Sequence, residues 1–198
     1  MKPLDCYLVF DFETTGLDPE TDRIIQVGLC EVHRGEVRRR SAWLVKQTVP
    51  IAPGAAKKHG ITDEQVRLHG EPPTKSARVL LKALNDAPAC MGHNIHRFDI
   101  PFIRAECDRL GMNCPDTLEY VDTAALYKGW KLGQPKRQRE TQAAYAERIL
   151  SQRVFGLKYA IPTCMQEFDI PVDQAQLHDA SRDAYATHLI FERLARHL

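Results

Sequence analysis

The sequence lacks long apolar runs, closely spaced cysteine pairs and a large excess of either charge, and each absence excludes a class of protein. No stretch approaches the roughly eighteen apolar residues of a transmembrane helix, so no membrane partner is expected. The first residues, MKPLDCYLV, lack the apolar core of a secretory signal. None of the six cysteines forms a Cys-x-x-Cys pair, and several lie in apolar stretches. This usage indicates reduced, buried thiols and a cytoplasmic location.

The composition is that of a soluble globular protein. The chain has 198 residues, 43% hydrophobic and 27% charged, which suffices for a sizeable core. We find neither an internal repeat nor a low-complexity segment, so a single domain over residues 1–198 is expected. Because the net charge is only +1, binding of an acidic substrate would need a local basic patch.

The order of the apolar segments predicts an α/β fold. Strands are expected at 6–13, 23–32 and roughly 37–45, with a turn at Arg34-Gly35 that makes them an antiparallel meander. The proline- and glycine-containing stretch 46–60 is predicted to be an irregular loop. Beyond it, we expect a helix opening at 62–66, a strand within 89–94, and further helices at about 74–86, 99–111 and 179–197. This pattern predicts a mixed sheet with helices on its faces.

The first predicted strand ends in the stretch DFETTG, which begins at Asp11. Side chains two residues apart on a strand point to the same face, so Asp11 and Glu13 project together, beside Val9. Two like charges at that spacing repel and raise each other's pKa, so a positive group should compensate them. Taken alone, the pair also suits a solvated strand end.

Two further acids lie at the ends of predicted elements. The apolar stripe of the last helix, through Ala186 and Ile190, continues back to Asp183, and His178 precedes that acid by five residues. Asp99 opens another helix, with a proline in its first turn. Clustered carboxylates suit Mg²⁺ or Mn²⁺, and two such ions stabilise the attacking and leaving oxygens of a phosphoryl displacement. His178 alone would also suit an ordinary loop histidine.

At this point the chain resembles a known family, the DnaQ-like DEDDh 3′–5′ exonucleases, which include the proofreading exonuclease of bacterial DNA polymerase III. DFETTG resembles the first motif of the family, NIHRFD (94–99) the second, and HDASRD (178–183) the third. HGIT (59–62) and VDT (121–123) are also similar to recurrent family stretches. The resemblance spans nearly the whole chain and implies a ribonuclease H-like fold with a mixed five-stranded sheet.

The resemblance also implies roles for individual residues. Asp11, Glu13, Asp99 and Asp183 would ligate two divalent cations, Mg²⁺ or Mn²⁺, and His178 would be the general base that deprotonates the attacking water. The products would be nucleoside 5′-monophosphates released from a 3′ end. The candidates for contact with the terminal nucleotide are Thr14, Thr15, Gly16, Leu17, Asn94 and Phe98.

A basic segment, residues 128–158, carries eight lysines and arginines against two acids. It exceeds what the family's core needs, and we interpret about 128–156 as a basic helical insertion. It favours either a solvated surface or a flap that binds the phosphate backbone or docks a partner. The candidate backbone contacts are Lys131, Lys136, Arg137 and Arg139.

The leading hypothesis is a metal-dependent 3′–5′ exonuclease acting on single-stranded or 3′-overhang DNA. An RNA 3′-end-trimming exoribonuclease is the alternative, and a non-catalytic nucleic-acid-binding module on the same fold is a third hypothesis. A polymerase or another nucleic-acid-processing protein is a candidate partner, and a homodimer is compatible with the sequence. His93 and His96 suit a zinc pair or loop positions, and the absence of a partner cluster favours the loop.

Overall fold

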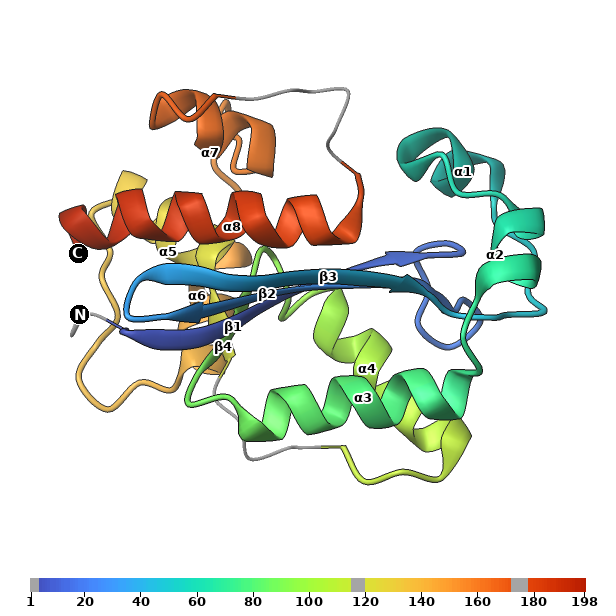
Figure 1. Ribbon diagram of the computed structural model, residues 1–198. Helices are drawn as coiled ribbons and strands as arrows, with labels where there is room; N and C mark the ends of the chain where they lie inside the picture. Colours follow the sequence, from blue (N-terminus) through green and yellow to red (C-terminus); the bar gives the residue numbers. More distant parts are fainter. Residues whose placement is uncertain (1–3, 115–119, 172–177) are drawn as a thin grey trace.

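The structure is a computed structural model, and it describes residues 4–114, 120–171 and 178–198. At its centre is a five-stranded sheet in the order β3-β2-β1-β4-β5 (Figure 1). β1 pairs antiparallel with β2 and parallel with β4, so the predicted mixed sheet is confirmed. The strands are β1 (Cys6–Thr14), β2 (Ile24–His33), β3 (Glu36–Leu44), β4 (Cys90–Gly92) and β5 (Tyr120–Asp122).

The predicted meander is joined by the predicted turn. Arg34 and Gly35 connect β2 to β3, and both have positive φ, 53° and 75°. A two-residue turn with this backbone matches the right-handed twist of the flanking strands, which fixes the register of the hairpin. β3 pairs along β2 and β2 along β1, with one register shift in each pair, at Glu31/Val32 and at Glu13/Thr14.

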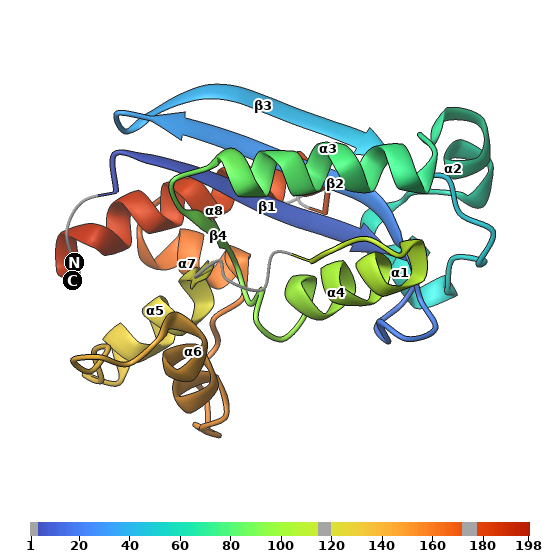
Figure 2. The same cartoon turned by 90° about the horizontal axis from the view of Figure 1, so that it is seen from below.

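Helices cover both faces of the sheet (Figures 1 and 2). Odd-numbered apolar residues of β1, such as Tyr7 and Val9, face one core, which includes residues of α5 to α8. Even-numbered ones, such as Leu8 and Phe10, face a second core under α3 and α4. The helices are α1 (Pro53–His59), α2 (Asp63–His69), α3 (Pro73–Asp86), α4 (Asp99–Leu110), α5 (Thr123–Lys131), α6 (Gln142–Leu150), α7 (Ile161–Glu167) and α8 (Ala180–Leu194). None of the helices in the described residues is long and apolar enough to cross a bilayer.

The prediction of an irregular loop over 46–60 is wrong in part, because this stretch contains α1. Pro53 occupies the first turn of α1, and Gly60 follows its end with a φ of 71°. Proline at a helix start and left-handed glycine just past a helix end are the usual boundary residues of a helix. The two residue types that suggested irregularity therefore delimit a short helix.

Two other helix ends are explained by local chemistry. Thr62 accepts a hydrogen bond from the Gln65 backbone while the Gln65 side chain accepts one from the Thr62 backbone, which is a capping box at the start of α2. Gly111 ends α4 with a φ of 62°, as predicted. The start of α2 and the end of α4 are thus each fixed by a residue that caps the helix.

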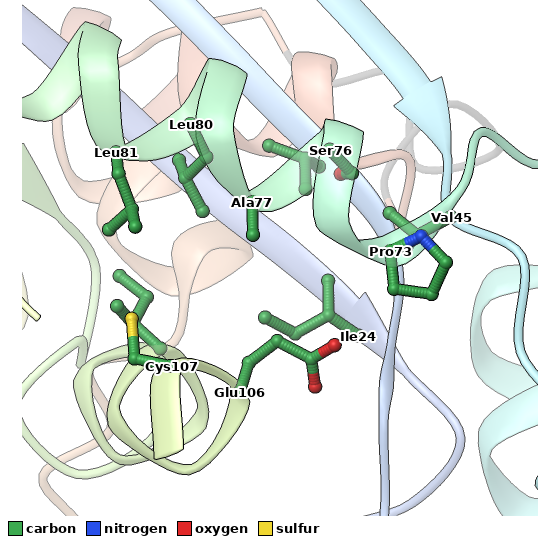
Figure 3. A pocket seen from close by; sticks show the side chains of 11 residues that line it. Ile24, Val45, Pro73, Ser76, Ala77, Leu80, Leu81, Glu106 and Cys107 are labelled. Atoms are coloured by element: carbon green, nitrogen blue, oxygen red, sulfur yellow. The ribbon is translucent and has the colours of Figure 1, made fainter. Parts of the chain in front are cut away.

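α3 and α4 enclose a small apolar cavity against the sheet (Figure 3). Leu80 and Leu81 of α3 face Cys107 of α4, and Ile24 closes the space from β2. The cavity measures about 20 Å³, which is room for one water at most. It is a packing gap of the core and too small to hold a nucleotide.

The basic segment is more internal than the sequence suggested. It consists of the end of α5, the whole of α6 and the loops around them, and Figure 2 shows α5 and α6 packed together. Lys128 is buried, and its Nζ donates to the backbone oxygens of Leu150 at 3.2 Å and Gln152 at 2.5 Å. One of the eight cations of this segment is therefore part of the interior.

Candidate active site

The carboxyl-terminal half of β1 presents Asp11 and Glu13 on one face, as predicted. They pair in register with Gly28 and Gln26 of β2. Glu13 is buried, whereas Asp11 keeps partial access to solvent. Both project on the face of the sheet that α8 covers, since Tyr7 and Val9 of the same strand face belong to the core beneath that helix.

The other two predicted acids come from the first turns of two helices. Asp99 is the first residue of α4, and its Oδ1 accepts a hydrogen bond from the Phe12 backbone N–H at 3.1 Å, between Asp11 and Glu13. Asp183 lies in the first turn of α8 and is buried. The amino-terminal end of a helix carries partial positive charge, which favours carboxylates at both places. Three elements far apart in sequence thus converge on one site.

β2 holds the start of α8 against this site. The Gln26 side chain donates to Asp179 Oδ2 at 3.0 Å and accepts from the Ala180 backbone N–H at 2.9 Å. A Cβ at Gly28 would lie 2.0 Å from the backbone of Ala180, so only glycine allows the helix to approach this closely. Gln26 and Gly28 therefore set the position of Asp183, and sequence reasoning missed both.

His178 lies beside Asp183 in a strained backbone conformation. Its φ is 70°, which is uncommon for a residue with a side chain and is often found at functional sites. Its backbone N–H donates to Asp183 Oδ1 at 3.3 Å, and its Nδ1 lies 3.8 Å from Asp183 Oδ2. That Nδ1 is buried and has no hydrogen-bond partner among the described residues. One ligand atom from each of Glu13, His178 and Asp183 lies within 4.8 Å of the others.

The carboxylates raise one another's pKa. For Asp11 the causes are desolvation followed by the charges of Asp99, Asp183 and Glu13, and its pKa lies well above the ordinary value. Burial is the main cause that raises the pKa of Glu13 to about 7. The pKa values of Asp99 and Asp183 are raised as well, chiefly by burial. Carboxylates destabilised as anions in this way fit a divalent cation, and their oxygens are the ligands that Mg²⁺ and Mn²⁺ prefer.

Lys58 is the cation that opposes this repulsion, and sequence reasoning missed it. It lies on α1, and its charge lowers the pKa of Asp11, Glu13 and Asp183. Its neighbour His59 has its Nδ1 occupied by the Ile61 backbone N–H at 3.0 Å. The stretch HGIT, directly after Lys58, could have drawn attention to this lysine. It was missed because 46–60 was predicted to be a loop, whereas Lys58 lies on α1.

The DFETTG turn has the properties expected of a nucleotide contact. The Thr14 hydroxyl donates to the Gly16 carbonyl at 2.6 Å, and the Thr15 hydroxyl donates to Asp22 at 2.9 Å, so the turn is fixed. Gly16 lies against the Asp22 carboxylate, where a Cβ would meet it at 2.4 Å. Leu17 follows with 85% of its surface exposed. An exposed leucine at the end of a rigid turn is available for packing against a base.

The loop between β4 and α4 carries the other two candidates. Asn94 has a φ of 63°, and its Oδ1 is buried without a hydrogen-bond partner among the described residues. Phe98 is half-buried, with its ring centroid 4.9 Å from that of Phe102. Asp122, in the VDT stretch, shapes this loop by accepting the backbone N–H groups of Asn94 at 2.9 Å and His96 at 3.1 Å.

The two loop histidines have structural contacts of their own. His93 Nδ1 lies 2.9 Å from Thr123 Oγ1, and its Nε2 lies 2.6 Å from the Tyr159 carbonyl oxygen. His96 Nδ1 lies 3.4 Å from Asp122 Oδ2. Burial opposes ionisation of Asp122, but the hydrogen bond from His96 and the charge of His93 outweigh it and lower the pKa of Asp122. These contacts fit the loop interpretation of both histidines.

Part of the predicted basic contact set is engaged within the protein. Lys131 Nζ pairs with Glu167 at 2.7 Å, and Lys136 donates to the Glu140 carbonyl. The Arg137 backbone N–H donates to the Glu140 carboxylate at 2.8 Å, and Arg139 has a φ of 64°. Part of the basic segment is thus paired with groups of the protein itself, whereas the carboxylates of the site repel one another.

The sequence matches a family model and several curated proteins. The family model described as Exonuclease (RNase T type) matches residues 8–191. The PolC-type DNA polymerase III of Thermotoga petrophila is 32% identical over 124 residues, which cover 62% of this chain and 9% of the polymerase. The PolC-type polymerase of Mycoplasma pneumoniae is 28% identical over 187 residues, covering 94% of this chain and 11% of its own length. The chain thus spans about a tenth of the length of these curated relatives.

Solved structures give the same fold. E. coli exonuclease I in complex with a dA16 oligonucleotide superposes with a TM-score of 0.74 at 19% identity, over 98% of this chain and 42% of that one. The apo form of exonuclease I gives a TM-score of 0.76 at 20% identity, over the same shares. The ribonuclease H-like fold expected from the motifs is thereby confirmed.

Proposed function

The chain belongs to the exonuclease family whose model matches residues 8–191, and on this premise we propose that it is a metal-dependent 3′–5′ exonuclease of the DEDDh type. The observation that carries the proposal is the convergence of Asp11, Glu13, Asp99 and Asp183, whose pKa values are all raised, beside His178. Burying four carboxylates together is unfavourable, because each loses much of its contact with water and repels the others. Such a cluster indicates a functional site that binds cations.

The four carboxylates would hold two Mg²⁺ or Mn²⁺ ions, which when bound polarise the scissile phosphate and stabilise the leaving 3′ oxygen. The protein's own contribution is positioning. Asp99 is fixed to the Phe12 backbone, and Asp183 is fixed to the His178 backbone and, through the start of α8, to Gln26. Carboxylates held in this way need no reorganisation when the reaction begins.

His178 is the proposed general base. Burial and the nearby charge of Lys58 lower its pKa, against the opposing effect of Asp183, so its imidazole is neutral at pH 7. A neutral imidazole accepts a proton from the attacking water, whereas an imidazolium does not. Its partial exposure leaves room for that water.

The proposed 3′–5′ polarity rests on the resemblance of the three motifs to the DEDDh family, and the proposed release of single nucleotides rests on the turn beside the carboxylates. Leu17 would pack against the base of the terminal nucleotide, with Thr14, Thr15 and Gly16 placing backbone groups near its sugar, and Asn94 and Phe98 completing the contact from the second loop. A site that encloses a terminal nucleotide in this way hydrolyses one nucleotide at a time. The expected products are nucleoside 5′-monophosphates.

Single-stranded DNA is the proposed substrate. It is supported by the likeness to exonuclease I, which has been solved with DNA oligonucleotides, and to PolC-type polymerases. The same relatives make a polymerase or another DNA-processing protein the proposed partner, in the cytoplasm. An RNA substrate is the alternative that the experiment below separates.

The test is a degradation assay on a 15-nucleotide strand labelled at either end. The wild-type protein should release labelled mononucleotide immediately from 3′-labelled DNA, and should shorten 5′-labelled DNA stepwise, with Mg²⁺ or Mn²⁺ and not with EDTA. Release from the 5′ label first would contradict the polarity, and faster degradation of a matched RNA strand would contradict the substrate. Binding without cation-dependent cleavage would favour the non-catalytic module.

Isothermal titration with Mn²⁺ measures the number of ions. In the presence of the expected product, a nucleoside 5′-monophosphate, two ions should bind to the wild-type protein. Fewer should bind to an Asp183→Asn variant. A single ion in the wild-type protein would contradict the two-metal proposal.

A further inference from the structure

A groove of about 690 Å³ lies beside the loop that leads to Asp99. One wall is Arg97, from that loop, and the other is the chain that follows α6, with Arg153, Phe155 and Tyr159. None of these residues is among the predicted individual substrate contacts, although Arg153 and Phe155 belong to the basic segment. Arg97 is two residues from Asp99, so one wall of the groove is continuous in sequence with the carboxylate site.

The groove is positively charged. Arg97 and Arg153 are exposed and have no ion-pair partner among the described residues, and buried Lys128 lies in the lining between them. No acid is among the described residues of the lining. The charge of Arg97 contributes to a lowered pKa at Lys128, after burial, which shows that the positive groups act on one another. A surface of this kind attracts a polyanion.

Phe155 is the most conspicuous side chain of the groove. It is fully exposed, and every other aromatic side chain in the described part of the chain is at least partly buried. Val154 beside it is also exposed. An exposed aromatic ring among cations is the arrangement by which proteins bind single-stranded nucleic acid, since a base stacks on the ring while the phosphates meet the cations.

The groove is rigidly connected to the catalytic loop. His93, on the loop from β4, contacts the Tyr159 carbonyl at 2.6 Å. Lys128 holds the Leu150 and Gln152 carbonyls, and its ammonium lies 5.1 Å from the centroid of the Tyr159 ring. The wall that carries Phe155 therefore starts from anchored residues on both sides. A strand bound there keeps a fixed relation to the carboxylates.

We propose that this groove binds the single-stranded DNA upstream of the reacting 3′ end, with Phe155 as a stacking platform and Arg97 and Arg153 as phosphate contacts. The inference rests on the proposed exonuclease function and deepens it. It differs from the predicted set of basic contacts, since Lys131 and Lys136 are engaged within the protein, whereas the described residues offer no ion-pair partner to Arg97 or Arg153. The chain would hold its substrate through this groove between successive cleavages.

The first test measures affinity. Fluorescein-labelled dT15 is titrated in EDTA, which prevents cleavage, and Phe155→Ala should weaken binding by about 5- to 100-fold, as expected for loss of one stacked base. Phe155→Trp should retain the affinity, and its tryptophan emission, measured against wild type, should be quenched by dT15. Val79→Ala, which truncates an exposed apolar residue on α3, is the matched control and should bind as wild type. Arg153→Gln should reduce the slope of log affinity against log salt by about one.

The second test separates this inference from the proposed function. The p-nitrophenyl ester of thymidine 5′-monophosphate reports only on the carboxylate site, and Phe155→Ala should hydrolyse it at the wild-type rate while its KM for dT15 rises. If wild-type protein cleaves neither substrate, the proposed function fails. If wild-type protein cleaves both and Phe155→Ala binds dT15 unchanged, the groove proposal is overturned and the exposed ring is assigned to a protein partner. Equal losses on both substrates would also overturn it, because they would mean that Phe155 acts on the carboxylate site and not on the strand upstream of it.

Discussion

Two glutamates of this chain, Glu13 in the carboxylate site and Glu140 in the basic segment, show opposite responses to their surroundings. Burial raises the pKa of Glu13 to about 7, whereas hydrogen bonds from Arg148 and the Arg137 backbone lower that of Glu140 to about 2. Glu140 meets Arg148 at 2.7 Å, so its charge is neutralised within the segment. The charge of Lys58 lowers the pKa of Glu13 without restoring it to its ordinary value, so the carboxylates around Glu13 are still open to a cationic ligand. An acid that is paired with a neighbouring arginine, such as Glu140, stabilises the local structure. An acid buried among other acids, such as Glu13, indicates a site that binds cations.

The largest expected effect is at Asp11. Asp11→Asn should lower turnover of dT15 by about 10³-fold or more, because it removes a proposed ligand of the cations while keeping the shape of the side chain. The free energy of unfolding in EDTA at pH 8, measured with urea, should not decrease, since one repelling charge is gone. Wild-type turnover in the variant would contradict the role of Asp11 as a ligand, and a loss of stability would show a structural role.

His178→Ala should have the next largest effect, a loss of about 10²- to 10⁴-fold in kcat, which is the usual contribution of a general base. Mn²⁺ should still bind, as measured by calorimetry, because the four carboxylates remain. In the wild-type protein the acidic limb of the pH–rate profile should lie below the ordinary histidine pKa, since burial and Lys58 lower the pKa of His178. Loss of Mn²⁺ binding in the variant would make His178 a ligand instead.

Glu13→Gln tests the unpaired charge through stability. The native pKa of Glu13, about 7, exceeds its ordinary value of 4.5, so between these pH values the native state holds a proton that the unfolded state has released. Metal-free wild-type protein should therefore lose stability as pH rises through this window, and the variant should lose less, by on the order of 1–3 kcal/mol at pH 8. Exposed Glu64 provides the control, since Glu64→Gln should follow the wild-type curve. Parallel curves for Glu13→Gln would contradict the raised pKa.

The smallest effect is expected in the basic segment. Neutralising Lys136, Arg137 and Arg139 to glutamine should weaken dT15 binding by roughly two- to fivefold and flatten its salt dependence. The effect is small because the Lys136 ammonium already donates to the Glu140 carbonyl. Anisotropy titrations at several salt concentrations measure both quantities. An unchanged salt slope would assign these residues to a solvated surface, whereas a loss larger than that of Arg153→Gln would reverse the ranking of the two basic surfaces.

The sequence predicted the parts of the site that depend on local periodicity. Asp11 and Glu13 follow from the two-residue repeat of a strand, and Asp183 follows from the apolar stripe of a helix, and the structure places these residues as predicted. The turn at Arg34-Gly35 was likewise predictable from its residue types. Each of these predictions required only neighbours in sequence.

The missed residues depend on contacts between distant segments. Only glycine fits at position 28, because the start of α8 packs against its backbone. The sequence around position 28 does not indicate contact with a helix that begins at Ala180. Lys58 acts on the site because the fold places α1 near it. Lys128 can be buried because its ammonium donates to a carbonyl at the end of α6. Long-range packing decides these cases, and single-sequence patterns do not contain it.

The close approach of α8 to Gly28 also has a consequence for biosynthesis. Asp183 and His178 join the site only when the chain around 178–194 has docked on a strand made some 150 residues earlier, at Gln26 and Gly28. A nascent chain on the ribosome that has not yet extruded this segment carries Asp11, Glu13 and Asp99 without their partners. The complete set of carboxylates is therefore available only once the segment 178–194 has been synthesised and has docked on β2 at Gly28.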